Sequence, residues 1–144
     1  MMEHDRAAID SLVARFFAVF DNRSGRIPSA SDFEALFIPS ALIATHKDGM
    51  PQVAAPLAFV EPRITLLTSG ALVDFHEWET QSQTEILGTL GVRRSRYSKQ
   101  GLLDGQPLQG AGTKYFHFAR LNQAWRIVFV SWIDDQIRGV NGRA

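Results

Sequence analysis

The sequence predicts an α+β fold, in which helices gather early in the chain and long antiparallel strands follow them. Apolar residues recur at helical spacing near the start, whereas β-branched and aromatic residues with glycine punctuation dominate from about residue 72. No linker, low-complexity stretch or internal repeat divides the chain. Helices first and consecutive strands afterwards favour one α+β domain over alternating βαβ units. We therefore expect residues 1–144 to form a single domain with its core at about 5–136.

The opening helix is the clearest expected element. Its apolar residues follow the i, i+3, i+4, i+7 pattern of one helix face. They are Ile9, Leu12, Val13, Phe16, Phe17 and Phe20. Asp5 is expected to cap the start of this helix, and Asp21-Asn22 followed by Gly25 to end it. A face so rich in phenylalanine needs a large concave partner.

A short helix, a hairpin of two short strands and a third helix are expected next. Their expected ranges are 31–37, 41–46 with 50–53, and 56–69. Ser31 or Asp32 caps the short helix, and Pro39 follows its end. Asp48-Gly49 is a strong turn signal for the hairpin. Pro62 either kinks the third helix or marks the true first turn of a shorter one.

Three or four long strands are expected in the second half of the chain. Their expected ranges are 73–83, 84–99, 110–122 and 125–136. Gly88 or Gly91 is expected to form a bulge, because a strand of that length must bend. Asp104-Gly105 and Asn122-Gln123 are expected to be turns, and residues 137–144 to be a frayed tail.

Composition narrows the classes of function. Lys and Arg together number 15, as do Asp and Glu, so the chain of 144 residues lacks a global basic field for nucleic acid. The absence of cysteine excludes disulfides, cysteine-zinc sites and a thiol nucleophile. The acidic start does not resemble a secretory signal, and no apolar run approaches the roughly 20 residues of a membrane helix. We therefore expect a cytoplasmic protein that binds neither nucleic acid nor membrane.

Four segments carry a resemblance to a known superfamily. They are AIDSLVARFFAVF, SDFEALF, ALIATHKDG and GTKYFHFARLNQAWRIVFVSWIDDQ. Over residues 5–136 the pattern resembles the nuclear transport factor 2-like superfamily, which includes ketosteroid-isomerase-like and polyketide-cyclase-like (SnoaL-like) proteins. Trp125-Arg126-Ile127 is similar to its closing signature. The resemblance implies three helices and a cone-shaped, curved sheet of about five to six mixed or antiparallel strands around a pocket, often paired as a dimer.

The resemblance does not imply one reaction. The isomerases of this superfamily use a carboxylate base, with a tyrosine and a protonated acid as oxyanion donors. This chain has only Tyr97 and Tyr115, and no aspartate can be assigned to a pocket-facing strand position from the sequence. This departure argues against the isomerase interpretation.

Histidines and one tyrosine are the candidate catalytic residues. His46, His76 and His117 fall on expected strands, whereas His4 lies in the N-terminal segment. A histidine inside a cone can act as general acid or base near neutral pH. We single out His76, His117 and Tyr97, and the alternative is that these are ordinary, hydrogen-bonded strand residues. No paired histidine spacing supports a metal, so we expect no metal site and no cofactor.

The candidate ligand-binding residues are aromatic or basic side chains expected to line the cone. They are Phe16, Phe20, His46, Trp78, Arg94 and Trp132. Strand alternation places Trp78 on one face with His76 and directs Glu77 and Glu79 outward unless a bulge intervenes. The alternative is that Trp78 belongs to the core or to the dimer surface.

The basic run at residues 93–97 has two interpretations. Arg94 could hold a carboxylate or phosphate by a guanidinium fork. The alternative is a solvated face with acidic partners across the sheet. The expected partners are Glu77, Glu79, Asp134 and Asp135.

Three functions remain open on the sequence alone. The first is binding of a small, apolar or aromatic ligand in a cone-shaped pocket. The second is a cofactor-free isomerase, cyclase or dehydratase with a pocket histidine as acid or base and Tyr97 or Arg94 steadying negative charge. The third is an interaction domain without catalysis. Both faces of the last two strands carry apolar bulk, so we also expect a homodimer through the sheet.

Overall fold

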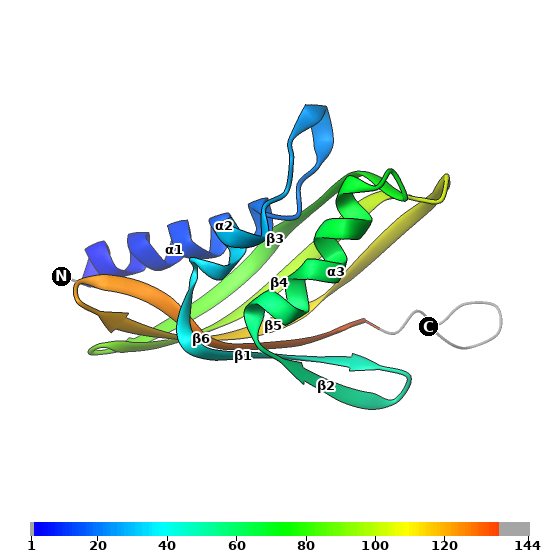
Figure 1. Cartoon of the computed structure of the whole chain (residues 1–144). Coiled ribbons are helices and arrows are strands. Elements are labelled where there is room, and N and C mark those ends of the chain that lie inside the picture. Colours follow the sequence, from blue (N-terminus) through cyan, green and yellow to red (C-terminus); the bar gives the residue numbers. More distant parts are fainter. Residues whose placement is uncertain (1, 136–144) are drawn as a thin grey trace.

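The computed structural model describes residues 2–135, which form three α-helices, one 3₁₀ turn and a six-stranded sheet (Figure 1). In chain order the elements are α1 (Met2–Ala18), η1 (Arg23–Gly25), α2 (Ala30–Glu34), β1 (Phe37–Lys47), β2 (Met50–Ala54), α3 (Pro56–Thr68), β3 (Leu72–Leu87), β4 (Leu90–Leu103), β5 (Gln106–Leu121) and β6 (Ala124–Asp134). The strand order is β2-β1-β6-β5-β4-β3. β1 and β6 run parallel, and the other neighbours are antiparallel. The predicted α+β class is confirmed.

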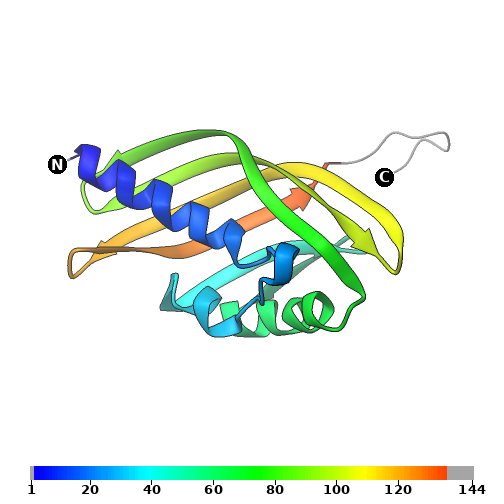
Figure 2. The ribbon, with the colours of Figure 1, turned by 90° about the horizontal axis from the view of Figure 1, so that it is seen from above.

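The helices lie on one side of the curved sheet (Figure 1). Seen from above, α1 crosses the long strands obliquely, and α2 and α3 lie beside it (Figure 2). All six predicted apolar residues of the opening helix are buried. At the centre of this core, Phe16 makes an edge-on contact with Phe116 of β5, with 5.1 Å between ring centroids. The concave partner that the phenylalanine-rich face requires is therefore the inner face of the sheet.

The start of α1 differs from the prediction. The helix already begins at Met2, so Asp5 is not its cap. The carboxylate of Asp5 instead accepts hydrogen bonds from Trp125 Nε1 at 2.9 Å and Arg120 Nη1 at 3.1 Å. The bond from Trp125 is the main cause that lowers the pKa of Asp5. Asp5 thus joins the first turns of α1 to the β5–β6 hairpin.

The segments around α2 and α3 differ in their boundaries. Ser29 caps α2 through a bond from Asp32 N at 3.2 Å, two or three residues earlier than expected. The helix ends at Glu34, and β1 runs through Pro39. Such a proline is tolerated because the pairing of β1 with β6 is interrupted there. Helix α3 continues through Pro62, so the alternative of a shorter helix is wrong.

The first long hairpin turns later than expected. β3 continues to Leu87, so the expected break between residues 83 and 84 is wrong. Gly88 has a φ of 61° and lies in the turn rather than in a bulge, and Gly91 is paired within β4. The register shifts that bend the sheet lie between Val73 and His76, between Glu79 and Gln81, and between His117 and Phe118. The turns predicted at Asp48-Gly49, Asp104-Gly105 and Asn122-Gln123 are confirmed. Residues 136–144, with the predicted tail, lie outside the described residues.

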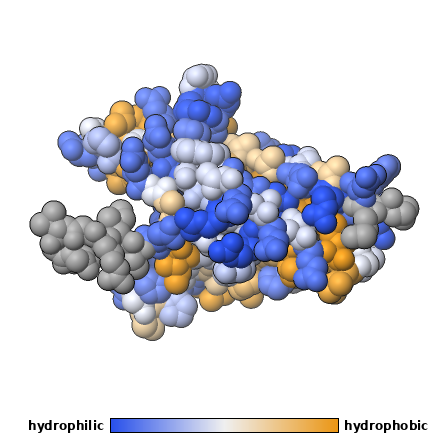
Figure 3. Space-filling view, turned by 180° about the vertical axis from the view of Figure 1, so that it is seen from behind, coloured by the Kyte–Doolittle hydropathy of each residue, from blue (hydrophilic) through white to orange (hydrophobic). Residues whose placement is uncertain are grey.

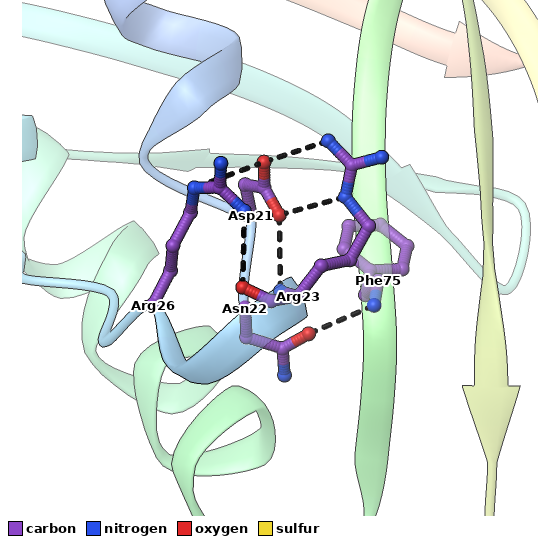
Figure 4. A network of polar contacts seen from close by, with 5 residues as sticks. All are labelled: Asp21, Asn22, Arg23, Arg26 and Phe75. Atoms are coloured by element: carbon purple, nitrogen blue, oxygen red, sulfur yellow. Dashed lines mark hydrogen bonds and ion pairs between the residues drawn. The ribbon is translucent and has the colours of Figure 1, made fainter.

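Asn22 fastens the end of α1 to the junction of α3 and β3. Its side-chain Nδ2 donates to the carbonyl oxygens of Leu67 and Leu72, both at 2.8 Å. Its Oδ1 accepts from Phe75 N at 2.8 Å, and its own backbone N–H donates to Phe75 O at 3.1 Å. Figure 4 shows Asn22 facing Phe75 in β3. One amide side chain thereby satisfies three backbone groups, one in the last turn of α3 and two at the irregular start of β3.

Next to Asn22, two arginines converge on Asp21 (Figure 4). Arg23 donates to both carboxylate oxygens at 3.0 and 2.9 Å, and Arg26 lies 3.8 Å away. The hydrogen bonds from Arg23 are the largest influence on this carboxyl and, despite an opposing effect of burial, they lower the pKa of Asp21 to about 2.

This pKa predicts acid sensitivity. A depressed folded-state pKa stabilises the fold above the ordinary value of 3.8, and that contribution is lost as the pH falls toward about 2. We expect Asp21→Asn to lower the free energy of unfolding by about 2 kcal/mol at neutral pH. The difference from wild type should shrink between about pH 4 and pH 2 in urea titrations. A difference that is constant down to about pH 2 would contradict the assignment.

Candidate functional site

A cavity of about 790 Å³ lies between α3, the β1–β2 hairpin and the inner face of β3–β6. Its apolar wall includes Phe20, Phe59, Leu66, Leu67, Leu72, Phe75 and Trp132. Its polar lining includes Thr45, His46, Lys47, Arg63, Glu77, Lys99, Lys114 and Asp134. This volume falls in the range of about 300–1,000 Å³ that is typical of small-molecule sites. An apolar wall with a few converging charged groups is also the usual character of such sites.

Lys114, in the middle of β5, is the most deeply buried charged group on the cavity wall, with 1% of its surface exposed. Its Nζ lies 3.6 Å from the centroid of the Trp132 ring and 4.0 Å from that of Tyr97. Such cation–π contacts replace part of the lost hydration. Burial lowers the pKa of Lys114 to about 8, although the negative charges of Glu77 and Asp134 oppose this effect.

Glu77 of β3 faces Lys114 across β4. Its Oε1 lies 3.5 Å from Lys114 Nζ, an ion pair in which both side chains are largely buried. Among the described residues, this Oε1 has no hydrogen-bond partner. A buried acceptor without a partner is uncommon and costly, because its desolvation is not offset. Oε1 itself is buried, and Lys114 Nζ at 3.5 Å is the charged group that faces it.

Asp134 at the end of β6 is held by two neighbours from β4. Tyr97 donates its hydroxyl hydrogen to Oδ1, and Lys99 Nζ contacts Oδ2 at 2.5 Å. Burial alone would raise the pKa of Asp134, but the bonds from Lys99 and Tyr97 outweigh it and lower the pKa. Burial and the bond to Asp134 both raise the pKa of Tyr97. Both oxygens of Asp134 are thus engaged, unlike Oε1 of Glu77.

Two glycines of β5 make this arrangement possible. Tyr97 and Lys99 must cross β5 to reach Asp134, and their paired residues on β5 are Gly112 and Gly110. A Cβ at Gly112 would lie 2.7 Å from Tyr97 Cζ, and one at Gly110 would lie 2.7 Å from Lys99 Cε. A side chain at either position would therefore displace a group that holds Asp134.

We expect Gly112→Ala to lower the free energy of unfolding by about 2 kcal/mol through overpacking against Tyr97. Gly91→Ala on β4 is the matched control, because its Cβ would meet Ile9 Cδ1 at 3.4 Å, and we expect it to cost less than about 1 kcal/mol. Urea titrations measure the free energy of unfolding of both variants. Equal costs for the two variants would contradict the proposed crossing of Tyr97 over Gly112.

Arg63 of α3 adds a third cation to the cavity. Its guanidinium lies 3.7 Å from the centroid of the Phe59 ring, and Nη1 donates to Phe59 O at 3.0 Å. Burial lowers the pKa of Arg63, which nevertheless stays protonated because an unperturbed guanidinium titrates above about 12. The charged groups of the lining are four cations and three carboxylates, namely Lys47, Arg63, Lys99 and Lys114 with Glu77, Asp134 and Asp135. The lining therefore favours a ligand that carries negative charge or a polarised oxygen.

An irregularity in β6 decides which side chains reach the cavity. His117 pairs with Phe129 and Phe118 with Ile127, so Val128 is an extra residue on β6. Strict alternation would place Trp125 and Trp132 on opposite faces, whereas the extra residue brings both to the inner face. Asp134 follows Trp132 to the inner face, so an aspartate does stand at a pocket-facing strand position, contrary to the expectation from the sequence.

The structure places the predicted ligand-binding residues on both faces of the sheet. Phe20, His46 and Trp132 line the cavity, whereas Phe16 is buried in the core below it. Trp78 stacks on His76 on the outer face, with ring centroids 4.4 Å apart. Arg94 lies with His117 along a separate hollow on that face. Only three of the six predicted residues therefore lie where one small ligand could touch them together.

None of the three predicted catalytic residues lines the cavity. His76 and His117 belong to the outer face, and the hydroxyl of Tyr97 already donates to Asp134. The expectation that Glu77 and Glu79 point outward is wrong. Glu77 lines the cavity, and Glu79 binds Arg93 on the inner face with an Oε1–Nη2 distance of 2.5 Å. His46 is the one predicted histidine on the cavity lining.

The expected charge pairing of the basic run is confirmed for two of its arginines. Arg93 binds Glu79, and it also binds Asp10 of α1 at 2.6 Å. Arg96 binds Asp135 at 2.9 Å. The Arg96–Asp135 pair fits a solvated face with acidic partners, whereas Arg93 is only 5% exposed, so its pairs are on the buried inner face.

Sequence reasoning missed Lys99, Lys114, Glu77, Asp134 and Arg63 as site residues. One signal was present in β5. Lys114 shares one face of β5 with Gly110, Gly112, Phe116 and Phe118, because residues two apart on a strand point the same way. It therefore interrupts a face made otherwise of glycine and phenylalanine. A lone lysine on such a face indicates a buried charge with a partner.

Comparisons with known proteins agree on the fold. No family model matches the chain, and no curated protein matches its sequence. The solved structures that it resembles include Kfla4162 from Kribbella flavida, with 17% identity and a TM-score of 0.75 over 94% of this chain and 93% of that one. A nuclear transport factor 2-like superfamily protein from Salmonella enterica subsp. enterica serovar Typhimurium str. LT2 has 15% identity and a TM-score of 0.75 over 97% of each chain.

A hexachlorocyclohexane dehydrochlorinase, LinA type 2, is also similar, with 12% identity and a TM-score of 0.76 over 93% of this chain and 87% of that one. At these identities the likeness concerns the fold. The chain has the nuclear transport factor 2-like fold, as the sequence resemblance implied. Among residues 2–135, no helix is both long and apolar enough to cross a membrane.

Proposed function

We propose that the cavity binds a small organic molecule with an apolar or aromatic body and an anionic or carbonyl oxygen. The observation that carries this proposal is the Glu77–Lys114 pair on the wall of an aromatic cavity. Lys114 Nζ has no described anion closer than Glu77 Oε1 at 3.5 Å, so a ligand oxygen could approach it more closely. Leu66 and the partly exposed Trp132 lie on the cavity wall, where an aromatic ring can pack.

Calorimetric titration with two matched probes tests this proposal. 2-Naphthoate carries a carboxylate, and 2-naphthalenemethanol has the same ring without the charge. We expect wild type to bind both, and Glu77→Met/Lys114→Met to lose at least about tenfold in affinity for naphthoate while keeping the alcohol, since a buried charge-assisted bond contributes about 1.5–3 kcal/mol.

Arg94→Met is the control, because it removes a cation from the outer face and leaves the cavity intact. Its affinity for naphthoate should equal that of wild type. Binding of neither probe to wild type overturns the proposal. Loss of naphthoate binding in Arg94→Met, with no loss in the double variant, overturns it in favour of the outer hollow.

A second candidate function is cofactor-free acid–base chemistry in the same cavity. The Glu77 carboxylate on the cavity wall supports a general base, a role for which the sequence alone favours a histidine. The dehydrochlorinase among the similar structures also supports it, because eliminating hydrogen chloride requires removal of a proton. We expect wild type to exchange the methyl hydrogens of 2-acetylnaphthalene for deuterium, and Glu77→Gln to do so about 100-fold more slowly by NMR. Equal rates would contradict this role.

We also propose that the outer face of the sheet pairs two copies of the chain. Trp78, Val92 and Tyr115 are exposed on that face. Hydrophobic side chains also gather in separate patches among hydrophilic ones on the back of the molecule (Figure 3). Light scattering after size-exclusion chromatography should give twice the monomer mass, and a monomer would refute the pairing. A cytoplasmic location and the absence of a cofactor stay predictions.

A further inference from the structure

The three lysines of the chain differ sharply in their surroundings. Lys47 is exposed at the mouth of the cavity, and Lys99 is engaged by Asp134 at 2.5 Å. Lys114 is 1% exposed, lies between two aromatic rings, and has Glu77 as its nearest described anion at 3.5 Å. The protein thus places one weakly paired amine on the cavity wall, beside a carboxylate oxygen without a hydrogen bond.

We propose that Lys114 captures a small aldehyde or ketone in the cavity as a covalent imine. This inference rests on the proposed function, because the carbonyl compound must first bind in the cavity. It goes beyond that function by naming carbonyl compounds as the ligand class and by assigning a covalent bond to one atom, Lys114 Nζ.

The neighbouring groups can carry every proton of the reaction. Glu77 accepts a proton from the ammonium of Lys114, and the free amine then attacks the carbonyl carbon, forming the C–N bond. Glu77 returns this proton to the oxygen and then carries a second proton from the attached nitrogen to the same oxygen, which restores the nitrogen lone pair. The C–O bond breaks, water leaves, and the lone pair forms the C=N bond. Ammonium and carbonyl thereby become iminium and water, with no oxidant or reductant. Within residues 2–135, Glu77 is the carboxylate that forms an ion pair with Lys114, with Oε1 3.5 Å from Nζ, and we assign these proton transfers to it.

The electrostatic surroundings favour a nucleophilic amine. Burial lowers the pKa of Lys114 to about 8, with Lys99 acting in the same direction and Glu77 and Asp134 opposing both. The groups that face Nζ are Glu77 from β3, Tyr97 and Lys99 from β4, and Trp132 and Asp134 from β6. With a pKa of about 8, about a tenth of the amine is neutral at pH 7, against less than about a thousandth for an ordinary lysine.

Reductive trapping tests the inference. Wild-type protein is incubated at about pH 7 with 2-naphthaldehyde and sodium cyanoborohydride, which reduces an imine to a stable amine. Peptide mapping by mass spectrometry then gives the labelling rate of each lysine and of the N-terminal amine separately. We expect Lys114 to be labelled at least about tenfold faster than Lys47. This preference should disappear in urea, where the surroundings of both lysines are alike.

Variants separate the role of each group. Lys114→Arg keeps a cation but cannot form an imine, so labelling at the other amines should be unchanged. Glu77→Gln should slow labelling of Lys114 about tenfold or more, because it removes the proton carrier. Arg94→Met, on the outer face of the sheet, should leave labelling of Lys114 within about twofold.

The matched acid distinguishes the two proposals. If 2-naphthoate binds the cavity while Lys114 is labelled no faster than Lys47, the imine inference is overturned and the proposed function stands. If neither naphthoate nor the alcohol binds and Lys114 is also unlabelled, both are overturned. If Lys114 is labelled and excess naphthoate suppresses this labelling, both proposals are supported.

Discussion

Lys114→Met is expected to lower the free energy of unfolding by about 3 kcal/mol or more. The substitution keeps the volume of the side chain and its contacts with Trp132, but it leaves the largely buried Glu77 carboxylate without its ion-pair partner at 3.5 Å. Removing one member of a buried pair is costly because the remaining charge is neither hydrated nor compensated. Glu77→Met should cost a similar amount for the complementary reason.

The double variant distinguishes this explanation from a simple loss of packing. With both charges gone, Glu77→Met/Lys114→Met is expected to unfold within about 1 kcal/mol of wild type, because buried pairs often gain little over apolar replacements. Urea titrations of the four proteins complete the cycle. Lys99→Met is the control, since the more exposed Lys99–Asp134 pair should cost about 1 kcal/mol. If the free-energy costs of Lys114→Met and Glu77→Met simply add in the double variant, the coupling between the two charges is refuted.

Asn22→Asp is expected to lower the free energy of unfolding by about 3 kcal/mol. The carboxylate has the shape of the amide and can still accept from Phe75 N. It replaces the Nδ2 donor with an oxygen that faces the carbonyl oxygens of Leu67 and Leu72. Two hydrogen bonds are lost and three acceptors are brought together, each loss costing about 1–3 kcal/mol when the group is left unsatisfied.

Asn122→Asp is the matched control for this substitution. Asn122 lies in the exposed β5–β6 turn with a φ of 52°, which aspartate also tolerates, so the change should cost less than about 0.5 kcal/mol. The cost of Asn22→Asp should also decrease as the pH falls toward about 4, because the two carbonyl oxygens favour the protonated carboxyl, which can donate to one of them. An equal effect of the two substitutions would show that Asn22 does not join α1 to β3.

The sequence contains enough to predict the fold. The phenylalanine-rich face of α1 and the glycine and asparagine turns are local sequence signals. The structure shows each of them at the predicted residues. The positions of the site residues depend on an irregularity in β6 that local sequence patterns do not contain. One extra residue at Val128 reverses the alternation of β6, which brings Trp132 and Asp134 to the inner face beside Trp125.

The charged residues of the cavity were missed for a related physical reason. Alternation alone does not decide which face of β3 is concave. The sequence therefore favours His76 and Trp78 as residues of the cavity and predicts that the Glu77 side chain points outward. The packing of α1 against the inner face of the sheet determines which face of β3 is concave. This packing joins segments that are far apart in the sequence. The crossing of Tyr97 and Lys99 over Gly112 and Gly110 likewise requires the register of three strands.

The central claim is that Lys114 meets the polar group of a ligand inside the cavity. NMR of protein labelled with carbon-13 at the lysine ε-carbons measures this directly, because the chain has three lysines and so three assignable signals. The Lys114 signal should titrate near the pKa of about 8 in free protein, and saturating 2-naphthoate should raise its midpoint and move it further than it moves the signal of the exposed Lys47 at the mouth of the cavity. A Lys114 signal whose position and midpoint do not change on saturation with naphthoate would contradict the account.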